Sequence, residues 1–221
     1  WDETDIRRYR WGYNRLVEMV DAEIGKVLDA LERTGHWDNT VIVFASDHAD
    51  GQGAHGWNQK WCVYDEVSRV PFIIKPPGNS PAGAVESRPV AASLDLFPTL
   101  CDYARIPAPP DIRGESLRPL LERGDASQRR NFVASETSFG TWGELHEDRW
   151  TKGRMIRTEK YKYAGYSSGS RREQLFDMVN DPFETANLAN NPAYASVIDG
   201  HRRHLKQWCD QTDDAFAMPA S

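Results

Sequence analysis

Apolar residues recur at helical spacing over the first part of the chain. They fall three or four positions apart, and charged side chains fill the intervals, which predicts a long amphipathic helix. Gly35 follows the last periodic turn, where glycine commonly ends a helix, and Asp38-Asn39 then predicts a turn. The periodic positions are Tyr13, Leu16, Val17, Val20, Ile24, Val27, Leu28 and Leu31.

The next segment is a short apolar run, residues 41–45, that is rich in β-branched side chains. This pattern predicts a strand buried on both faces of a parallel sheet, and helix, turn and strand in that order form half of an α/β unit. Asp47 and His48 follow the strand, and three glycines between residues 51 and 56 allow the next loop to turn tightly. Because open α/β sheets bind ligands beyond the carboxyl ends of their strands, we place the chemistry in this loop.

The rest of the chain is predicted to contain further helices and strands, and it changes from an α/β part to a small α+β part around residues 137–152. Residues 139–150 combine glycines and aromatic residues without a regular period, which is typical of a pocket-lining loop, and His146 within it is a candidate substrate contact. The expected elements are a short helix at 60–67, a strand at 70–74, a helix capped by Ser93 that continues to Tyr103, a short helix or turn at 117–121, an edge strand at 131–135, a hairpin of 154–157 with 161–163, a strand at 174–176 and a closing helix at 192–209.

Composition allows a substantial core and narrows the class of partner. The chain has 221 residues, of which 39% are hydrophobic, and a formal net charge of -6 without a clustered basic face, which argues against nucleic acid or an acidic membrane as partner. An anionic substrate stays compatible with this charge, because a cation and a lysine can reverse the field inside a pocket. The three cysteines are widely separated, and no apolar run is long enough to cross a bilayer.

Asp47 and His48 are candidate ligands of a divalent cation, because a carboxylate suits hard ions and an imidazole shifts the preference towards Mn, Fe or Zn. The alternative is an aspartate that caps the loop beside a histidine satisfied by the backbone. His55 could be a ligand or a substrate contact, or could bond locally, and Asp50 is more simply a loop-capping acid. Lys60 could meet a tetrahedral anion, although most lysines are merely solvated.

Several motifs follow one another between Tyr13 and Leu188. They are Asp21-Ala22-Glu23-Ile24-Gly25, then Asp47-His48-x-Asp50-Gly51-x-Gly53-x-His55-Gly56 with Lys60, then Arg69-Val70-Pro71-Phe72-Ile73-Ile74, Leu94-Asp95-Leu96-Phe97-Pro98-Thr99-Leu100, Arg157-Thr158-Glu159-Lys160-Tyr161-Lys162-Tyr163 and Asn180-Asp181-Pro182-x-Glu184-x-x-Asn187-Leu188. In this order they resemble the second half of the sulfatase family, metal-dependent members of the alkaline phosphatase superfamily.

The resemblance implies a fold and a set of roles. The implied fold is α/β, with a mixed central sheet flanked by helices in residues 1–137 and a small antiparallel α+β subdomain with a closing helix in residues 138–221. Asp47 and His48 would be ligands of one divalent metal ion, Lys60 would neutralise the oxyanion or the leaving-group oxygen, and His55 would lie close by. Ca²⁺ is the first expectation. His48 stands where many relatives have Asn, however, and Mn²⁺ or another transition ion suits a histidine better.

One departure concerns the nucleophile. Sulfatases use a formylglycine made from the first residue of Cys/Ser-x-Pro/Ala-x-Arg, and no segment fits: Cys101 has Arg105 at the right offset, but Tyr103 occupies the Pro/Ala position within an amphipathic helix. The family's N-terminal acidic ligands are absent too. We therefore expect the C-terminal portion of a sulfatase-like hydrolase of organic sulfate esters, inactive alone, with the formylglycine in the missing N-terminal half of the same protein.

Two alternatives stay open. Some relatives with histidine at the position of His48 cleave phosphonate monoesters or phosphodiesters, so the protein could belong with them. It could also be a non-catalytic binding module in which Trp142 and Trp150 stack on sugar faces, although packing is the simpler role of these tryptophans. The expected ligand is a small-molecule or carbohydrate sulfate ester, and the resemblance favours a periplasmic or secreted protein.

Overall fold

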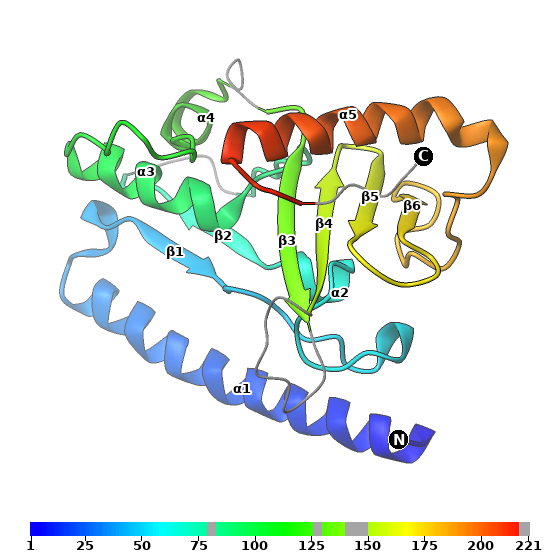
Figure 1. The fold of residues 1–221 in the computed structure, drawn as a ribbon. Helices are drawn as coiled ribbons and strands as arrows, with labels where there is room; N and C mark the ends of the chain where they lie inside the picture. Colours follow the sequence, from blue (N-terminus) through cyan, green and yellow to red (C-terminus); the bar gives the residue numbers. More distant parts are fainter. Residues whose placement is uncertain (79–82, 126–129, 140–149, 217–221) are drawn as a thin grey trace. The chain divides into compact units, whose positions relative to one another are not determined.

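The chain forms two compact units. The computed structural model describes residues 1–78, 83–125, 130–139 and 150–216 (Figure 1). No helix in these ranges has the length and apolarity to cross a bilayer. Unit 1 comprises Trp1–Lys60, Val70–Val85 and Ala92–Ser127, and unit 2 comprises Trp61–Arg69, Glu86–Ala91 and Gln128–Ser221. The expected domain boundary between residues 137 and 138 falls inside a strand of unit 2, so the compact units differ from the expected domains.

Unit 1 begins with the long amphipathic helix that the periodicity predicts. This helix, α1, spans Glu3–Arg33, and a capping box starts it: the carboxylate of Asp2 accepts from the backbone N–H of Asp5 at 2.9 Å, and the Asp5 carboxylate accepts from the Asp2 N–H at 3.2 Å. Gly35 has a φ of +70° just after the C-terminal end. The predicted helix and its glycine stop are therefore confirmed, and the helix starts earlier than the apolar pattern indicated.

The predicted central strand is present, but its surroundings differ from the expectation. β1, Ile42–Ala45, pairs with β2, Phe72–Lys75, in antiparallel register with Ile42 opposite Lys75. Among the described strands, β1 has this one antiparallel neighbour, so the expected parallel neighbour is not found there. The expected burial on both faces was wrong, because Phe44 and Ala45 are exposed.

The remainder of unit 1 consists of α3, Ala92–Ala104, and α4, Arg118–Arg123. α3 begins at Ala92, so Ser93 lies in its first turn and not at the expected cap position. Two side chains of α3 fix the segment before α4: Asp95 Oδ1 accepts from the N–H of Glu115, and Thr99 Oγ1 accepts from the N–H of Leu117, both at 2.9 Å. Among the described residues of unit 1, the buried apolar side chains are those of Leu117 and of two prolines, Pro76 and Pro98.

Unit 2 is an antiparallel sheet with a helix across it. The strands are β3, Val133–Phe139, β4, Thr151–Arg157, β5, Tyr161–Tyr166, and β6, Glu173–Asp177, hydrogen-bonded in that order. After a 3₁₀ turn at Pro192–Tyr194, α5, Ala195–Thr212, lies across the strands (Figure 1). The predicted edge strand, hairpin, last strand and closing helix are all confirmed. The expected helix at 60–67 is reduced to α2, Asp65–Ser68.

The core of unit 2 has two layers because successive strand residues point to opposite faces. Ile156 and Tyr163 face α5, where Leu205 is fully buried, whereas their neighbours Met155 and Ala164 face the other side and pack with Val63. The larger cluster consists of Ile156, Tyr163, Leu175, Ile198, Leu205, Cys209 and Phe216. The sheet is thus covered on both sides by segments of its own unit.

Two buried cationic side chains, those of Lys162 and Arg154, form ion pairs within unit 2. Lys162 of β5 donates to the carbonyl of Val63 at 3.0 Å and forms ion pairs with Asp65 and, at 2.9 Å, with Glu184. Burial raises the pKa of Glu184 against the opposing charge of Lys162.

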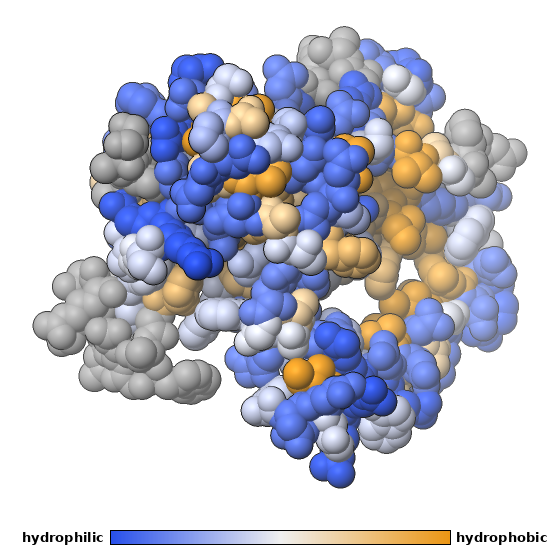
Figure 2. Space-filling view, turned by 90° about the vertical axis from the view of Figure 1, so that its right-hand side faces the viewer, coloured by the Kyte–Doolittle hydropathy of each residue, from blue (hydrophilic) through white to orange (hydrophobic). Residues whose placement is uncertain are grey.

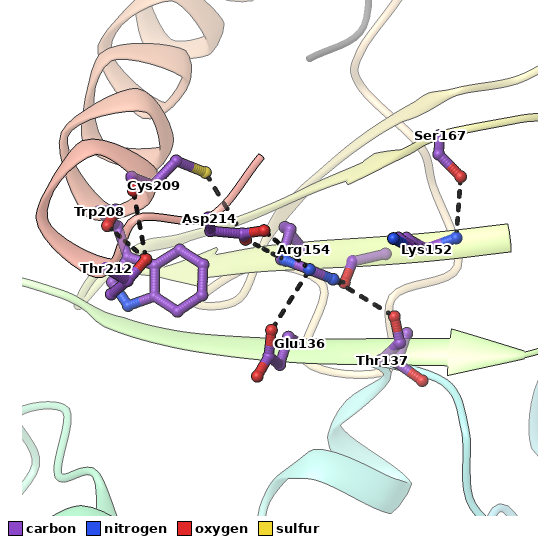
Figure 3. A network of polar contacts seen from close by, with 10 residues as sticks. Glu136, Thr137, Lys152, Arg154, Ser167, Trp208, Cys209, Thr212 and Asp214 are labelled. Carbon is purple, nitrogen blue, oxygen red and sulfur yellow. Dashed lines mark hydrogen bonds and ion pairs between the residues drawn. The ribbon is translucent and has the colours of Figure 1, made fainter. Parts of the chain in front are cut away.

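Arg154 of β4 makes a two-pronged pair with Asp214 at 2.6 and 3.2 Å, which holds the segment after α5 against the sheet, and an ion pair with Glu136 (Figure 3).

Candidate functional site

The candidate site is built on the loop that follows β1. Backbone bonds close this loop twice: the Gly51 N–H donates to Gln59 at 2.9 Å, and the Gly53 N–H donates to Trp57 at 2.8 Å. A Cβ atom at Gly51 would lie 2.8 Å from the Trp57 carbonyl oxygen, and Gly53 has a φ of +83°. Glycine is required at both positions, as the loop pattern in the sequence predicted.

Asp47 and His48 converge at the carboxyl end of β1. The backbone N–H of His48 donates to Asp47 Oδ1 at 2.8 Å, and His48 Nε2 lies 3.6 Å from Asp47 Oδ2. His48 Nδ1 is 3.0 Å from the carbonyl oxygen of Ala49, which can only accept, so Nδ1 carries a proton in this contact. Nε2, which lies on the side of the Asp47 carboxylate, is then the ring nitrogen left for another partner.

The Asp47 carboxyl is held in its charged form. Its pKa lies below the ordinary value, first because it accepts the His48 backbone hydrogen bond, and then because of the charge of His48 and, to a smaller extent, that of Lys60. Trp57 Nε1 donates to the Lys60 carbonyl at 2.7 Å and fixes the backbone there.

Asp50 has the structural role that the sequence favoured for it. Its Oδ1 accepts from the Gln52 N–H at 2.8 Å and its Oδ2 accepts from the Tyr9 hydroxyl at 2.6 Å, so it caps the loop and attaches it to α1. The hydrogen bond to Asp50 raises the pKa of Tyr9 to about 12, which keeps the phenol protonated. Arg10 Nε adds a bond of 2.7 Å to the Gln52 carbonyl.

The structure does not bring the other predicted site residues together with Asp47 and His48. His55 is exposed and has a φ of +54°, an uncommon conformation for a residue other than glycine that often accompanies functional constraint. The described residues contain no cluster of three or more metal-binding side chains, so His55 does not form such a cluster with Asp47 and His48. His146 and Trp142 lie outside the described residues.

The residues present fit a divalent cation as part of a site. A deprotonated carboxylate and a free imidazole nitrogen 3.6 Å apart are suitable donors, and both are solvent-accessible. Two donors are fewer than the four or more that such an ion takes, so within the described part of the chain the set is incomplete. Asp47 and His48 as metal ligands, and Lys60 and His55 as catalytic groups, remain predictions.

Sequence reasoning missed two features of this loop. Gln52, His55 and Gln59 all have positive φ, and without glycine at these positions the sequence carries no signal for it. The bonds from Tyr9 and Arg10 to the loop join residues more than 40 positions apart. A search for polar residues on the otherwise apolar face of the first helix could have found Tyr9 alone.

Comparisons with known proteins agree with this fold. Residues 53–211 match the family described as N-sulphoglucosamine sulphohydrolase, C-terminal. The Delta 4,5-hexuronate-2-O-sulfatase of Bacteroides thetaiotaomicron is 35% identical over 98% of this chain and 44% of its own length. A solved 2-O GAG sulfatase superimposes with a TM-score of 0.82 at 34% identity, over the whole chain and 48% of that protein. The phosphonate monoester hydrolase of Agrobacterium radiobacter has a TM-score of 0.81 at 31% identity, over 96% of this chain and 43% of that protein.

These matches define the class as α/β proteins of the alkaline phosphatase fold. Within this class the chain belongs to the sulfatase family, and the matching family description is that of a C-terminal part. The chain spans about half the length of the relatives that it matches. The predicted family and fold class are therefore confirmed.

Proposed function

We propose that the protein of which this chain forms a part hydrolyses organic sulfate esters, with a sulfated carbohydrate as the substrate class. The observation that carries the proposal is the proximity of the Asp47 carboxylate and the His48 imidazole at the end of β1, 3.6 Å apart, in a chain of the sulfatase family. The substrate class rests on the hexuronate sulfatase, a relative at 35% identity.

Each residue has a role that follows from its chemistry. Asp47 and His48 would hold one divalent cation, which, when bound, polarises the sulfuryl oxygens. Lys60 would neutralise charge that develops on the ester or leaving-group oxygen, because an ammonium is a compact point charge. His55, exposed in the same loop, would bind the substrate or transfer a proton close to Lys60.

The chain supplies only part of this machinery. Cys101 lies within α3, so this cysteine, which has Arg105 at the offset of the formylglycine motif, is in a helix. We expect the nucleophile in the part of the polypeptide outside this chain, and we expect the 221 residues alone to be inactive. Calcium is the first expectation for the metal, and His48 makes manganese or another transition ion the alternative.

The test uses the complete protein and two esters. Turnover of 4-nitrophenyl sulfate and of a phenylphosphonate monoester is measured for the wild type, for Lys60→Ala and for Lys26→Ala, a matched surface lysine paired with Glu23 on α1. We expect sulfate turnover to dominate, Lys60→Ala to lower kcat/KM by about 100-fold or more, and Lys26→Ala to change it little. Equal loss in both variants would refute the role of Lys60, and normal turnover by the 221-residue chain alone would refute the division of the site.

One observation favours a second candidate within the same fold. His48 supplies a nitrogen donor, and the chain is 31% identical to a phosphonate monoester hydrolase. If this candidate is correct, the phosphonate ester is turned over faster than the sulfate ester and the bound metal is a transition ion. A binding module without catalysis would turn over neither ester, yet would bind a sulfated sugar equally well after Asp47→Ala.

A further inference from the structure

Two tryptophans of unit 2 stack on each other. The ring centroids of Trp61 and Trp150 lie 6.3 Å apart with an interplanar angle of 28°, a favourable arrangement for aromatic rings, and Trp61 is 41% exposed. Exposure alone would not single out this pair, because other hydrophobic side chains also reach the surface, in patches between hydrophilic ones (Figure 2). The stack and the backbone that presents it distinguish these two residues, which we call the tryptophan pair.

The backbone of Trp61 adopts a conformation that bulky residues avoid. Its φ is +78°, in the left-handed region that favours glycine. Such strain persists only where the surrounding structure enforces it, and residues held in this way cluster at ligand-binding sites. Glycine would relieve the strain but would also remove the indole, so the conformation favours a role for the side chain itself.

The segment that follows Trp61 is fixed to unit 2 by buried polar contacts. The Val63 carbonyl accepts from Lys162 Nζ at 3.0 Å, and the Asp65 N–H donates to Glu184 Oε2 at 2.6 Å. Val63 and Lys162 are almost fully buried, so movement of this segment would leave buried polar groups without partners. Trp61 is therefore presented from a rigid support, which lowers the entropy lost when a ligand binds.

The place of Trp61 in the chain indicates the chemistry of its ligand. It directly follows Lys60, and because a trans peptide bond joins them their α-carbons are about 3.8 Å apart. Lysine offers a compact positive charge, and an indole offers a flat, rigid and largely apolar face. A sulfated sugar is complementary to both, since its ester group is an anion and its pyranose ring has an apolar C–H face.

We propose that the tryptophan pair is a platform on which the pyranose ring of a sulfated carbohydrate substrate stacks. This inference rests on the proposed function and deepens it, because it makes Trp61 a determinant of specificity for carbohydrate esters over other sulfate esters. Trp150 supports the indole of Trp61 through the stack. An inorganic sulfate ion has no ring, so it binds without the platform and provides a reference ligand.

The test measures binding to the complete protein, so it does not depend on turnover. Calorimetric titrations with glucosamine 6-sulfate, glucuronate 2-sulfate and inorganic sulfate are made for the wild type and three variants. Trp61→Leu keeps an apolar side chain without a flat ring, and Trp61→Phe keeps the ring. Phe183→Leu is the matched control, at an aromatic residue of unit 2 that is 72% exposed.

We expect Trp61→Leu to raise the Kd of the better-bound sugar sulfate by about 10-fold or more, and Trp61→Phe by about 3-fold or less. Phe183→Leu should leave this Kd unchanged. The Kd of inorganic sulfate should be the same in all four proteins. If Trp61→Leu does not fold, Trp150→Leu takes its place, because it removes the other half of the stack.

Three results would overturn the proposal. They are equal affinity of the wild type and Trp61→Leu for the sugar sulfate, an equal loss of affinity for inorganic sulfate, and no binding of either sugar sulfate to the wild type. Sugar binding that depends on Trp61 in a protein that hydrolyses no sulfate ester would refute the proposed function but not the platform. Hydrolysis of a sugar sulfate with an unchanged KM in Trp61→Leu would refute the platform but not the proposed function.

Discussion

The two units contain similar lengths of chain but differ in what lies at their centres. In unit 2, one cluster of apolar side chains is buried between the sheet and α5, and a second is buried on the other face of the sheet with Val63. In the described part of unit 1, no such cluster forms, although α1 and β1 are as clearly patterned as any element of unit 2. The difference shows that amphipathic elements give a core only when both of the surfaces to be packed are present.

The candidate site lies in the unit without a core. Asp47, His48 and Lys60 all belong to unit 1, where hydrogen bonds from Tyr9 and within the glycine loop hold their local geometry. Unit 2 contains none of the three. The candidate site and the two apolar clusters thus lie in different units, and the following predictions compare the two units.

The largest effect is expected at Lys162. Replacing it by methionine leaves the Asp65 and Glu184 carboxylates without their cation, and Glu184 is almost fully buried. Removing one partner of a buried ion pair costs about 3 to 5 kcal/mol, so we expect Lys162→Met to lower the free energy of unfolding of unit 2 by that amount in urea titrations. The double variant Lys162→Met, Glu184→Leu should recover part of the loss. A Lys162→Met protein as stable as the wild type would contradict this.

A matched pair of leucines compares the two units directly. Leu205 is fully buried in unit 2, and Leu16 is 61% exposed on α1. We expect Leu205→Ala to reduce stability by about 2 to 5 kcal/mol and Leu16→Ala to change it by less than about 0.5 kcal/mol in the 221-residue chain. Hydrogen exchange of β5 amides measures the first effect. The comparison fails if both alanine variants lose the same stability.

The segment after α5 should contribute less to the stability of unit 2 than Lys162 and Leu205 do. Asp214→Ala removes the two-pronged partner of Arg154, whose side chain is nearly buried (Figure 3). Asp210→Ala, by contrast, breaks an exposed ion pair with Lys206 one turn earlier. We expect a loss of about 2 kcal/mol for the first variant and less than about 0.5 kcal/mol for the second. Chemical denaturation of both variants gives the difference. Equal values would show that the Arg154 contact does not stabilise the sheet.

The smallest effect is a pH dependence in unit 2. Burial lowers the pKa of His201, which donates from Nδ1 to the Val197 carbonyl at 2.8 Å, and the charge of His204 lowers it further. Because the unfolded chain takes up the proton first, stability should be full above pH of about 6.5 and fall as the pH decreases towards the folded pKa. His201→Gln should remove this dependence, whereas His36→Gln, at an exposed position of unit 1, should retain it. Melting temperatures between pH 5 and 8 measure both.

Local patterns in the sequence predicted most elements correctly. The 3.6-residue period identified α1, and the alternation around Thr158 identified the hairpin of β4 and β5. The pairing of β1 could not be predicted, because an apolar strand looks the same whether its neighbour is parallel or antiparallel. The bond between Arg154 and Asp214 spans 60 residues and has no local signal.

For the site, the motif placed Asp47 and His48 correctly at the end of a strand, and the structure shows them close together. The motif could not show which nitrogen of His48 is free, since that depends on the contact of Nδ1 with the Ala49 carbonyl. It also supplied only two donors, fewer than a divalent cation takes. The local geometry was therefore predictable, and a complete ligand set was not.

The metal content of the complete protein tests the central claim most directly. After dialysis, the divalent metal bound per chain is measured by mass spectrometry in the wild type, in Asp47→Ala and in Asp38→Ala, a matched aspartate in the turn before β1. If Asp47 and His48 hold the cation, the wild type and Asp38→Ala contain about one equivalent and Asp47→Ala loses most of it. Full metal content in Asp47→Ala would contradict the account.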